Sequence, residues 1–182
     1  PCFPATGDKA RSESDFTFAG RSFTRYYHSL GQLQSGPEFG SNWTHSYSGT
    51  LTSSTGQARF NERGYLQTYS SGRGNQVAGE TLRKRENGQF DLIEATGSKR
   101  VYSAQGRLSA VEDGDPRTAV TLEYDAKGRL ARIADSAGRA LVFAYDQSRI
   151  SSITLPDGSV ARYSYDQYNN LVKVDRPDGS SS

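Results

Sequence analysis

The stretch LEYDAKGRLARIADSAGRALVFAYD, residues 122–146, contains the dipeptide Tyr-Asp near its start and again at its end. Similar heptapeptides occur on either side, because YSAQGRL begins at residue 102 and YDQYNNL begins at residue 165. The tyrosines of the four copies are Tyr102, Tyr124, Tyr145 and Tyr165, and consecutive ones are 22, 21 and 20 residues apart. This near-constant spacing predicts a tandem array in which each copy is one supersecondary unit.

The array extends towards the N-terminus in a weaker form. FNERGYL begins at residue 60, two periods before YSAQGRL, and LRKRENGQFDLI takes the place of the copy between them. The repeats are therefore expected to start near residue 58. This divides the chain into an N-terminal domain at residues 1–57 and a repeat array of β-hairpins at residues 58–182.

A second feature of each copy is a pair of apolar residues three positions apart. The pairs are Leu108 and Val111, Leu130 and Ile133, Ile150 and Ile153, and Leu171 and Val174. Turn signals such as PDG and SAG interrupt the chain every 8–12 residues, which is too short for a stable helix. The pairs therefore predict strands, with a β-bulge or local twist between the two apolar positions.

The residues after each tyrosine predict tight turns. An aspartate follows the tyrosine in three copies, as Asp125, Asp146 and Asp166. Its short side chain is expected to accept hydrogen bonds from the next backbone amides and so to close the turn. Gly128 and Asn169 share one turn position, Gly158 ends another turn, and all of these residue types tolerate positive φ.

The composition agrees with strands and turns. The chain has 19 glycines, 11 tyrosines and no methionine. In RALVFAY, residues 139–145, the large side chains of Leu141, Phe143 and Tyr145 alternate with smaller ones, as expected for a sheet packed on one face. We predict an all-β fold in which successive antiparallel hairpins form a twisted, spiralling open sheet.

The N-terminal block is also strand-like and rich in aromatic residues. DFTFAGRSFTRYY contributes Phe16, Phe18, Phe23 and Tyr27 as candidate core residues. Trp43 is the only tryptophan and is expected to be a buried anchor rather than a ligand platform. Arg25 is expected to stack or to bridge to the sheet.

Several classes of function lack support in the sequence. A formal net charge of +2 produces no long-range field for nucleic acid, and no apolar run is long enough to span a membrane. One aspartate per turn does not supply the several oxygen ligands that calcium needs. His28 and His45 are the only imidazoles and lie outside the array, so we expect no metal site, no catalytic site and no cofactor.

The repeat Tyr-Asp-x-x-Gly-Arg-Leu resembles the YD repeat of the Rhs (rearrangement hotspot) family of bacterial polymorphic toxins. Related repeats occur in toxin-complex C subunits and in teneurins. PCFPATGDK, SDF, FTRYYHSL and FGSNWTHSYSGTL resemble the domain that precedes the repeats in Rhs proteins. The two resemblances together cover almost the whole chain.

The resemblance implies a long β-sheet that spirals into a hollow shell around a toxic C-terminal domain until delivery into a competing cell. Self-cleavage in this family occurs in a proline- and glycine-rich motif after the last repeat, and that motif is absent here. The chain is then expected to be a non-catalytic structural segment of an exported or cell-surface bacterial protein. Its partners would be the rest of the shell and the toxin domain.

The alternative is a surface module that binds carbohydrate or a protein partner. Its candidate residues are Arg83, Lys84 and Arg85, with Lys99 and Arg100 expected across a hairpin. Such a cluster is usually a solvated face. A further expectation concerns the strand at residues 161–165 or the one at residues 171–174: one of them should be a sheet edge through which the chain self-associates or recruits another strand.

Overall fold

The computed structural model describes residues 2–3, 7–30, 37–54, 57–62, 65–70, 75–77 and 79–182, with side chains described at 7–30, 38–52 and 79–182. In chain order the elements are β1 (Cys2–Phe3), β2 (Asp8–Phe18), β3 (Arg21–His28), the 3₁₀-helix η1 (Pro37–Phe39), β4 (Trp43–His45), β5 (Thr50–Ser54), β6 (Gln57–Glu62), β7 (Tyr65–Ser70), β8 (Asn75–Val77), β9 (Glu80–Lys84), β10 (Phe90–Ile93), β11 (Lys99–Tyr102), β12 (Leu108–Glu112), the 3₁₀-helix η2 (Pro116–Thr118), β13 (Val120–Tyr124), β14 (Leu130–Asp135), β15 (Ala140–Asp146), β16 (Arg149–Thr154), β17 (Val160–Tyr165) and β18 (Leu171–Asp175).

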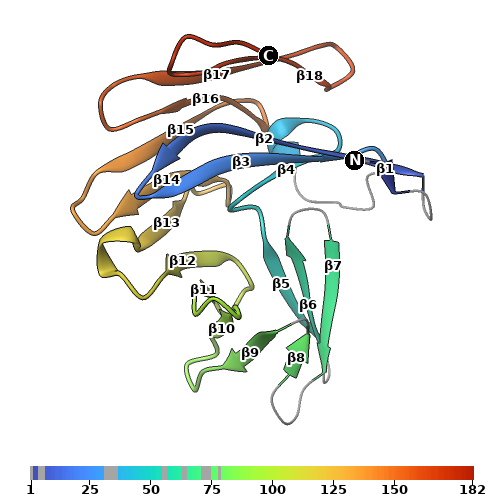
Figure 1. The fold of residues 1–182 in the computed structure, drawn as a ribbon, viewed down its shortest axis with the longest axis vertical. Coiled ribbons are helices and arrows are strands. Elements are labelled where there is room, and N and C mark those ends of the chain that lie inside the picture. Colours follow the sequence, from blue (N-terminus) through green and yellow to red (C-terminus); the bar gives the residue numbers. More distant parts are fainter. Residues whose placement is uncertain are drawn as a thin grey trace.

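The strands form three antiparallel sheets (Figure 1). The largest has eleven strands in the order β18 to β8, so each strand pairs with its neighbours in sequence. Strands β1 to β4 form a second sheet, and β5 to β7 form a third. The described residues contain no α-helix. The prediction of an all-β fold built from successive antiparallel hairpins in an open sheet is confirmed.

Seven turns between strands of the large sheet, and one more after β18, have the same backbone hydrogen bonds. In the turn after β13, the amide of Asp125 donates to the carbonyl of Arg129, and the amide of Gly128 donates to the carbonyl of Asp125. The fourth residue of each turn has positive φ, 77° at Gly128 and 67° at Asn169. A three-residue hairpin loop of this kind needs a left-handed residue at that position, which explains the regular glycines. Gly158 has φ of 85°, so the prediction of positive φ at Gly128 and Gly158 is confirmed.

A β-bulge follows the start of every second strand from β12 to β18, as the apolar pairs predicted. In β14, Leu130 pairs with Tyr124 and Arg132 pairs with Glu123, so Ala131 is an extra residue. The same shift occurs in β12, β16 and β18. Without a bulge, residues three apart would point to opposite faces. With it, both Leu130 and Ile133 are buried on the same side.

The hairpin between β15 and β16 differs from its equivalents, and the prediction for Asp146 was wrong. Asp146 continues the strand and pairs with Arg149 across a two-residue turn, where Gln147 has φ of 54°. The Asp146 carboxylate therefore contacts the Arg149 side chain, at 3.3 Å, instead of capping backbone amides. The physical reason is length, because YDQSRI is one residue shorter than YDAKGRL before its apolar residue.

The N-terminal hairpin of β2 and β3 lies across the large sheet and completes its core (Figure 1). Phe23 of β3 packs on Phe143 of β15, with ring centres 6.2 Å apart. Phe39 of η1 meets the ring of Tyr163 edge-on at 4.7 Å. Tyr47 also belongs to this core. The apolar face of the repeats is thus covered by aromatic residues of the N-terminal block.

The other predicted residues of the N-terminal block have different degrees of burial. Phe18 is buried, while Phe16 is partly buried and stacks on Phe23 at 5.0 Å. Trp43 and Tyr27 are partly exposed and pack on one another at 5.2 Å. Trp43 is therefore an anchor at the margin of the core rather than a fully buried one.

The weak repeat copies lie in two different sheets. LRKRENGQFDLI forms most of the β9–β10 hairpin of the large sheet, with the same turn as the regular copies. FNERGYL forms the β6–β7 hairpin, which pairs with β5 instead of joining the large sheet, and its turn lies outside the described residues. The predicted boundary between residues 57 and 58 falls at the start of β6, within this three-stranded sheet.

Candidate functional site

The repeats are joined by hydrogen bonds from the tyrosines that define them. The hydroxyl of Tyr124 donates to the carbonyl of Leu108, 2.7 Å away in the preceding copy. In the next copies, the hydroxyl of Tyr145 donates to the carbonyl of Leu130 at 2.9 Å. Tyr165 repeats the contact with Ile150 at 2.8 Å. In these three copies, the tyrosine therefore joins its copy to the one before.

Arginines make a second contact between neighbouring copies. The guanidinium of Arg129 lies 4.3 Å from the ring centre of Tyr145. The same stacking places Arg107 over Tyr124 at 5.6 Å and Arg149 over Tyr165 at 5.0 Å. Cation–π contacts of this kind add modest stability at partly exposed sites. The Arg of the Gly-Arg-Leu motif thus contacts the tyrosine of the following copy.

We call Tyr124, Tyr145 and Tyr165, with their hydrogen bonds to the preceding copies, the tyrosine ladder. These tyrosines are suited to donate hydrogen bonds at neutral pH. Burial raises the pKa of Tyr124, Tyr145 and Tyr165 above the usual value of a phenol. The hydroxyls therefore stay protonated. Tyr102 is also fully buried and pairs with Leu108 between β11 and β12, but Ser103 replaces the aspartate after it.

Asp125 closes its turn with both carboxylate oxygens. One accepts hydrogen bonds from the amides of Lys127 and Arg129, each at 2.9 Å, and the other accepts from the Arg129 side chain. Asp166 makes the same two backbone contacts, with the amides of Tyr168 and Asn170. The backbone amide of Arg129 is the main cause that lowers the pKa of Asp125; burial opposes it, and the Arg129 side chain adds to the lowering.

SAG at residues 136–138 predicted a turn, but the role of Asp135 in closing it was not predicted. Its carboxylate accepts from the amides of Ala137 and Arg139 and from the Arg139 side chain, as at Asp125. The signal was present, since DSAGR at residues 135–139 has the same form as DAKGR at residues 125–129. The turns before and after β14 are therefore of one type.

A buried charge cluster anchors the N-terminal hairpin to the last repeats. Arg25 is 1% exposed and donates to both carboxylate oxygens of Asp15, at 2.7 and 2.9 Å. It also donates to Glu13 at 2.7 Å and lies 4.8 Å from the ring centre of Trp43. The hydroxyl of Tyr163, 148 residues along the chain, donates to Asp15 at 2.9 Å. The predicted bridge from Arg25 to the sheet is therefore made through Asp15.

The electrostatics of this cluster favour an ionised Glu13 and a neutral, protonated Tyr163. Burial alone would raise the pKa of Glu13, but the neighbouring guanidinium of Arg25 outweighs it and lowers the pKa. Burial, together with the charge of Asp15, raises the pKa of Tyr163. Arg176, just after β18, also approaches Glu13, at 3.3 Å. Apart from the bridge from Arg25, this cluster could not be predicted from the sequence, because its members come from opposite ends of the chain.

The basic residues predicted as a glycan or partner surface have partners within the chain. Arg83 and Arg85 each lie 2.6 Å from one carboxylate oxygen of the buried Asp91. Lys84 lies over the ring of Phe90 at 5.7 Å. Burial would raise the pKa of Asp91, but hydrogen bonds from the two arginines outweigh it and lower the pKa.

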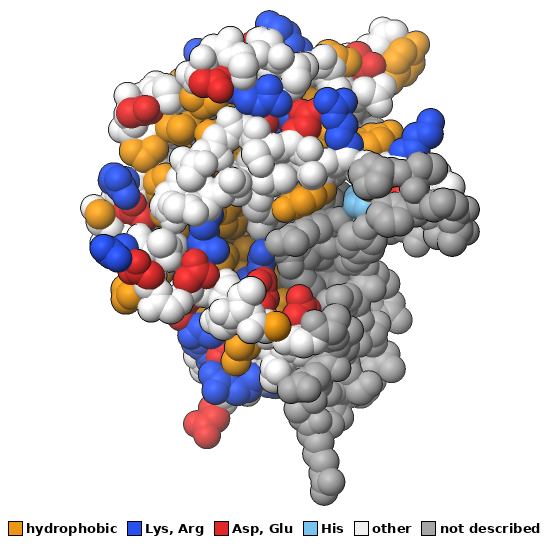
Figure 2. Space-filling model, viewed as in Figure 1, with side chains coloured by type: hydrophobic (Ala, Val, Ile, Leu, Met, Phe, Trp, Pro, Cys, Tyr) orange, Lys and Arg blue, Asp and Glu red, His pale blue; other side chains and the backbone are white. Residues whose placement is uncertain are grey.

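The predicted position of Lys99 and Arg100 was wrong. They do not lie across a hairpin from residues 83–85, because β10 runs between β9 and β11. Lys99 pairs with Glu112 at 2.6 Å, and Arg100 pairs with Glu94 at 3.1 Å. Figure 2 likewise shows Lys and Arg side chains interspersed with Asp and Glu on the described part of this face. The pairing leaves the alternative function without a specific observation in its favour.

The two histidines pair with carboxylates. His28 lies 2.6 Å from Asp8, and His45 lies 2.9 Å from Glu38. The described residues contain no group of three or more His, Cys, Asp or Glu side chains arranged to hold a metal ion. Within the same residues, no helix has the length and apolar character needed to cross a membrane.

Residues 69–182, which contain the tyrosine ladder, match the family described as Teneurin YD-shell. The chain belongs to this family. Residues 1–76 match a second family, described as Domain of unknown function (DUF6531). The predicted membership of the Rhs/YD-repeat group is therefore confirmed, and the chain has the structural role of a β-shell segment.

The chain is also similar to chains in solved structures. The chain is similar to a chain in "Crystal Structure of TcdB2-TccC3-Cdc42", with 14% sequence identity and a TM-score of 0.36. The similarity covers 94% of this chain and 10% of that chain, so this chain spans about a tenth of its length. No curated protein matches the chain.

Proposed function

We propose that this chain is a non-catalytic segment of an Rhs/YD-repeat secreted toxin and forms part of a β-shell that encloses a C-terminal toxin domain in interbacterial competition. The observation that carries the proposal is the tyrosine ladder. Each copy uses the tyrosine hydroxyl and the stacked arginine to hold its neighbour, so an array of any length is built from one repeated contact. These residues therefore act in assembly rather than in chemistry.

The two faces of the large sheet support an enclosing role. The covered face carries the apolar pairs and the core, including Ile133 and Ile153, both fully buried. The opposite face carries polar and charged side chains, with Val142 and Val172 as exposed exceptions. A sheet that is apolar on one face only must be packed on that side. The N-terminal hairpin does this here, and further repeats with their enclosed domain would continue it.

The division of the chain fits the proposal. We propose that residues 1–57 form the Rhs-type N-terminal domain that leads into the shell and that residues 58–182 form its first repeats. The rest of the shell and the toxin domain are the proposed partners, in a protein exported from the cell or displayed at its surface. One edge of the large sheet is β18, where Ser182 exchanges two hydrogen bonds with Val174. We propose that further repeats of the parent chain add at this edge; self-association of the isolated chain there stays a prediction, which light scattering would test.

Protection of the enclosed domain tests this function in the full-length parent protein. The expected result is that a protease leaves the domain after the repeats intact, although it digests the same domain expressed alone. Replacing Tyr124, Tyr145 and Tyr165 together with Phe should loosen the ladder and speed digestion. Tyr168→Phe is the matched control, because Tyr168 is 73% exposed and its side chain has no role in the ladder. Equal digestion of the enclosed and isolated domains would exclude encapsulation.

Competition between bacterial strains tests the biological part separately. A strain that carries the parent protein should outcompete a sensitive strain, and the advantage should disappear when the domain after the repeats is deleted. An unchanged advantage after the deletion would show that the shell does not deliver that domain.

A further inference from the structure

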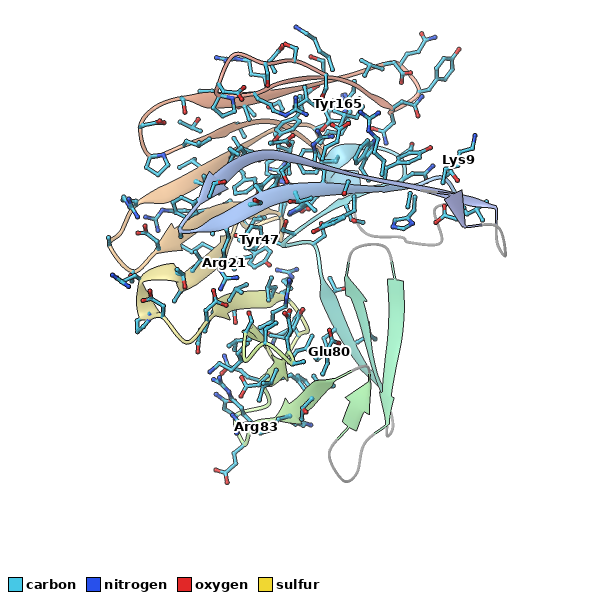
Figure 3. All side chains as sticks on the ribbon, in the orientation of Figure 1. Lys9, Arg21, Tyr47, Glu80, Arg83 and Tyr165 are labelled. Carbon is cyan, nitrogen blue, oxygen red and sulfur yellow. The ribbon has the colours of Figure 1, made fainter. Side chains whose placement is uncertain are left out.

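A cavity of about 310 Å³ opens where the N-terminal block meets the repeats. Its walls come from β3, from the turn after β4 and from β11 and β12, which are far apart in sequence. Arg21 and Arg100 are its charged wall residues, and hydroxyl side chains make up most of the rest. Figure 3 shows Arg21 and Tyr47 next to one another beneath the N-terminal hairpin. The volume is at the lower end of ligand pockets, roughly 300–1,000 Å³, so the cavity suits one small ligand.

Each of the two guanidinium groups is held by one acidic residue outside the cavity wall and by one backbone carbonyl. Arg21 pairs with Asp113 at 2.5 Å and donates through Nε to the carbonyl of Thr118 at 3.2 Å. Arg100 donates to Glu94 at 3.1 Å and to the carbonyl of Ser46 at 3.1 Å. Asp113 and Glu94 do not line the cavity. These contacts orient the guanidiniums without placing a carboxylate in the wall.

Hydroxyl groups complete the wall. Ser22, Thr24 and Tyr26 alternate along β3 and so lie on one face of that strand. The Tyr47 hydroxyl makes no hydrogen bond to the part of the chain that the structure describes. Burial raises the pKa of Tyr47, so the hydroxyl is a protonated donor at neutral pH.

We propose that this cavity is an oxyanion-binding site that takes a single carboxylate or phosphate group of a small ligand. Two oriented guanidiniums from different elements and one neutral hydroxyl donor converge on a concave site with no acidic wall residue. Charge-assisted hydrogen bonds of this kind are the strong ones, and guanidinium suits both oxyanions. The counter-carboxylates keep the local net charge near zero, so binding depends on hydrogen-bond geometry rather than on long-range attraction.

This site differs from the arginines on the outside of the sheet. Arg83 is 64% exposed at its side chain and faces a buried carboxylate, so water competes for its remaining donors. Arg21 and Arg100 are 20% and 9% exposed at their side chains. The cavity therefore offers donors that are less hydrated than those of the outer surface. Oxyanion binding in this cavity does not depend on the shell function and is tested separately from it.

Calorimetric titration of the whole chain tests the proposal with two probes, inorganic phosphate and malonate, at constant ionic strength set with chloride. Saturable binding at one site is expected for at least one probe. Phosphate alone, malonate alone or both would show which oxyanion the site accepts, and saturation by neither would overturn the proposal.

Three substitutions locate the binding. Tyr47→Phe removes one hydroxyl and should weaken binding by about tenfold, since hydrogen bonds to charged groups are the stronger class. Arg100→Gln should abolish binding. Arg132→Gln is the control, because Arg132 pairs with Glu123 on the exposed face of the array, and should leave binding unchanged.

Thermal unfolding without ligand shows whether each variant is folded. If Arg100→Gln does not fold, Tyr47→Phe decides the outcome. Equal binding by Tyr47→Phe, Arg132→Gln and the original chain would place the ligand elsewhere and overturn the proposal.

Discussion

The repeat array and the N-terminal hairpin are held by different kinds of interaction. In the array, the same hydrogen bond joins each copy to the one before it, over 15 or 16 residues of sequence. In the hairpin, Arg25 and Asp15 form a single buried ion pair that reaches Tyr163, 148 residues away from Asp15. The array thus repeats one polar contact along its length, whereas the hairpin has a single buried charge cluster beside its apolar packing on the large sheet.

This difference predicts unequal tolerance to substitution. Loss of one contact in the array leaves the equivalent contacts of the other copies intact, so each costs little. Loss of one partner in the buried cluster leaves its charges only partly compensated inside the protein.

Asp15→Ala should have the largest effect. It leaves the buried Arg25 without its bidentate partner and should cost about 3–5 kcal/mol of unfolding free energy, measured by urea denaturation. The matched control is Glu123→Ala, which breaks an exposed pair with Arg132 and should cost at most about 1 kcal/mol. Replacing Asp15 and Arg25 together with Leu and Met should recover most of the loss. Equal costs for the two single variants would show that the cluster does not anchor the hairpin.

Gly106→Ala and Gly158→Ala should separate a contact between sheets from a free turn. Both glycines have positive φ. A Cβ added at Gly106 would lie 1.7 Å from the carbonyl oxygen of Leu51, whereas a Cβ added at Gly158 would have no other heavy atom within 4 Å. Gly158→Ala should cost about 1 kcal/mol from backbone strain alone. Gly106→Ala adds overpacking and should cost about 2–4 kcal/mol. Urea denaturation measures both, and similar values would mean that the β5 contact adds nothing.

Tyr145→Phe should have a smaller effect, because it removes one hydrogen bond of the ladder and keeps the ring. The expected loss is about 0.5–1.5 kcal/mol in thermal or urea unfolding. Tyr168→Phe, at an exposed turn residue, should change stability by less than about 0.5 kcal/mol. A loss well above that range for Tyr145→Phe would indicate that the repeats unfold as one cooperative unit rather than copy by copy.

The smallest expected effect is the loss of stability at low pH through the turns that Asp125 and Asp166 close. The folded pKa of Asp125 and Asp166 lies below the unfolded value, so their contribution is present above about pH 4 and is lost as pH falls through the folded pKa. Asp125→Asn keeps an oxygen acceptor for the amides but removes this titration. The urea midpoint of the variant should therefore fall less steeply than that of the original chain below about pH 4. An unchanged acid dependence would show that Asp125 does not contribute to it.

Local features of the fold were predictable from the sequence because their causes are local. The period, the bulge between apolar residues three apart and the positive φ at Gly128 and Gly158 all depend on a few adjacent residues. The incorrect prediction that Asp146 caps backbone amides also has a local cause. One missing residue in the loop changes the hairpin type, although the Tyr-Asp signature is unchanged.

Contacts between distant segments were not predictable from the sequence, even where the strands themselves were predicted. The partners of Arg85 and Arg100 depend on β10 lying between β9 and β11, which a cluster of basic residues in sequence does not reveal. The cavity at Arg21 and Tyr47 depends on how β3 meets β11 and β12. Neither feature produces a residue spacing in the sequence from which it could be predicted.

The sequence by itself determined the repeat, the strands and most turns, because turn chemistry and alternation act over fewer than about ten residues. Only the tertiary structure decided that the N-terminal hairpin covers the apolar face of the repeats and that Arg25 becomes a buried charge. The physical reason is that burial and charge pairing depend on which surfaces meet. That meeting is set by the packing of the whole chain, since Asp15 and Tyr163 are neighbours only after folding.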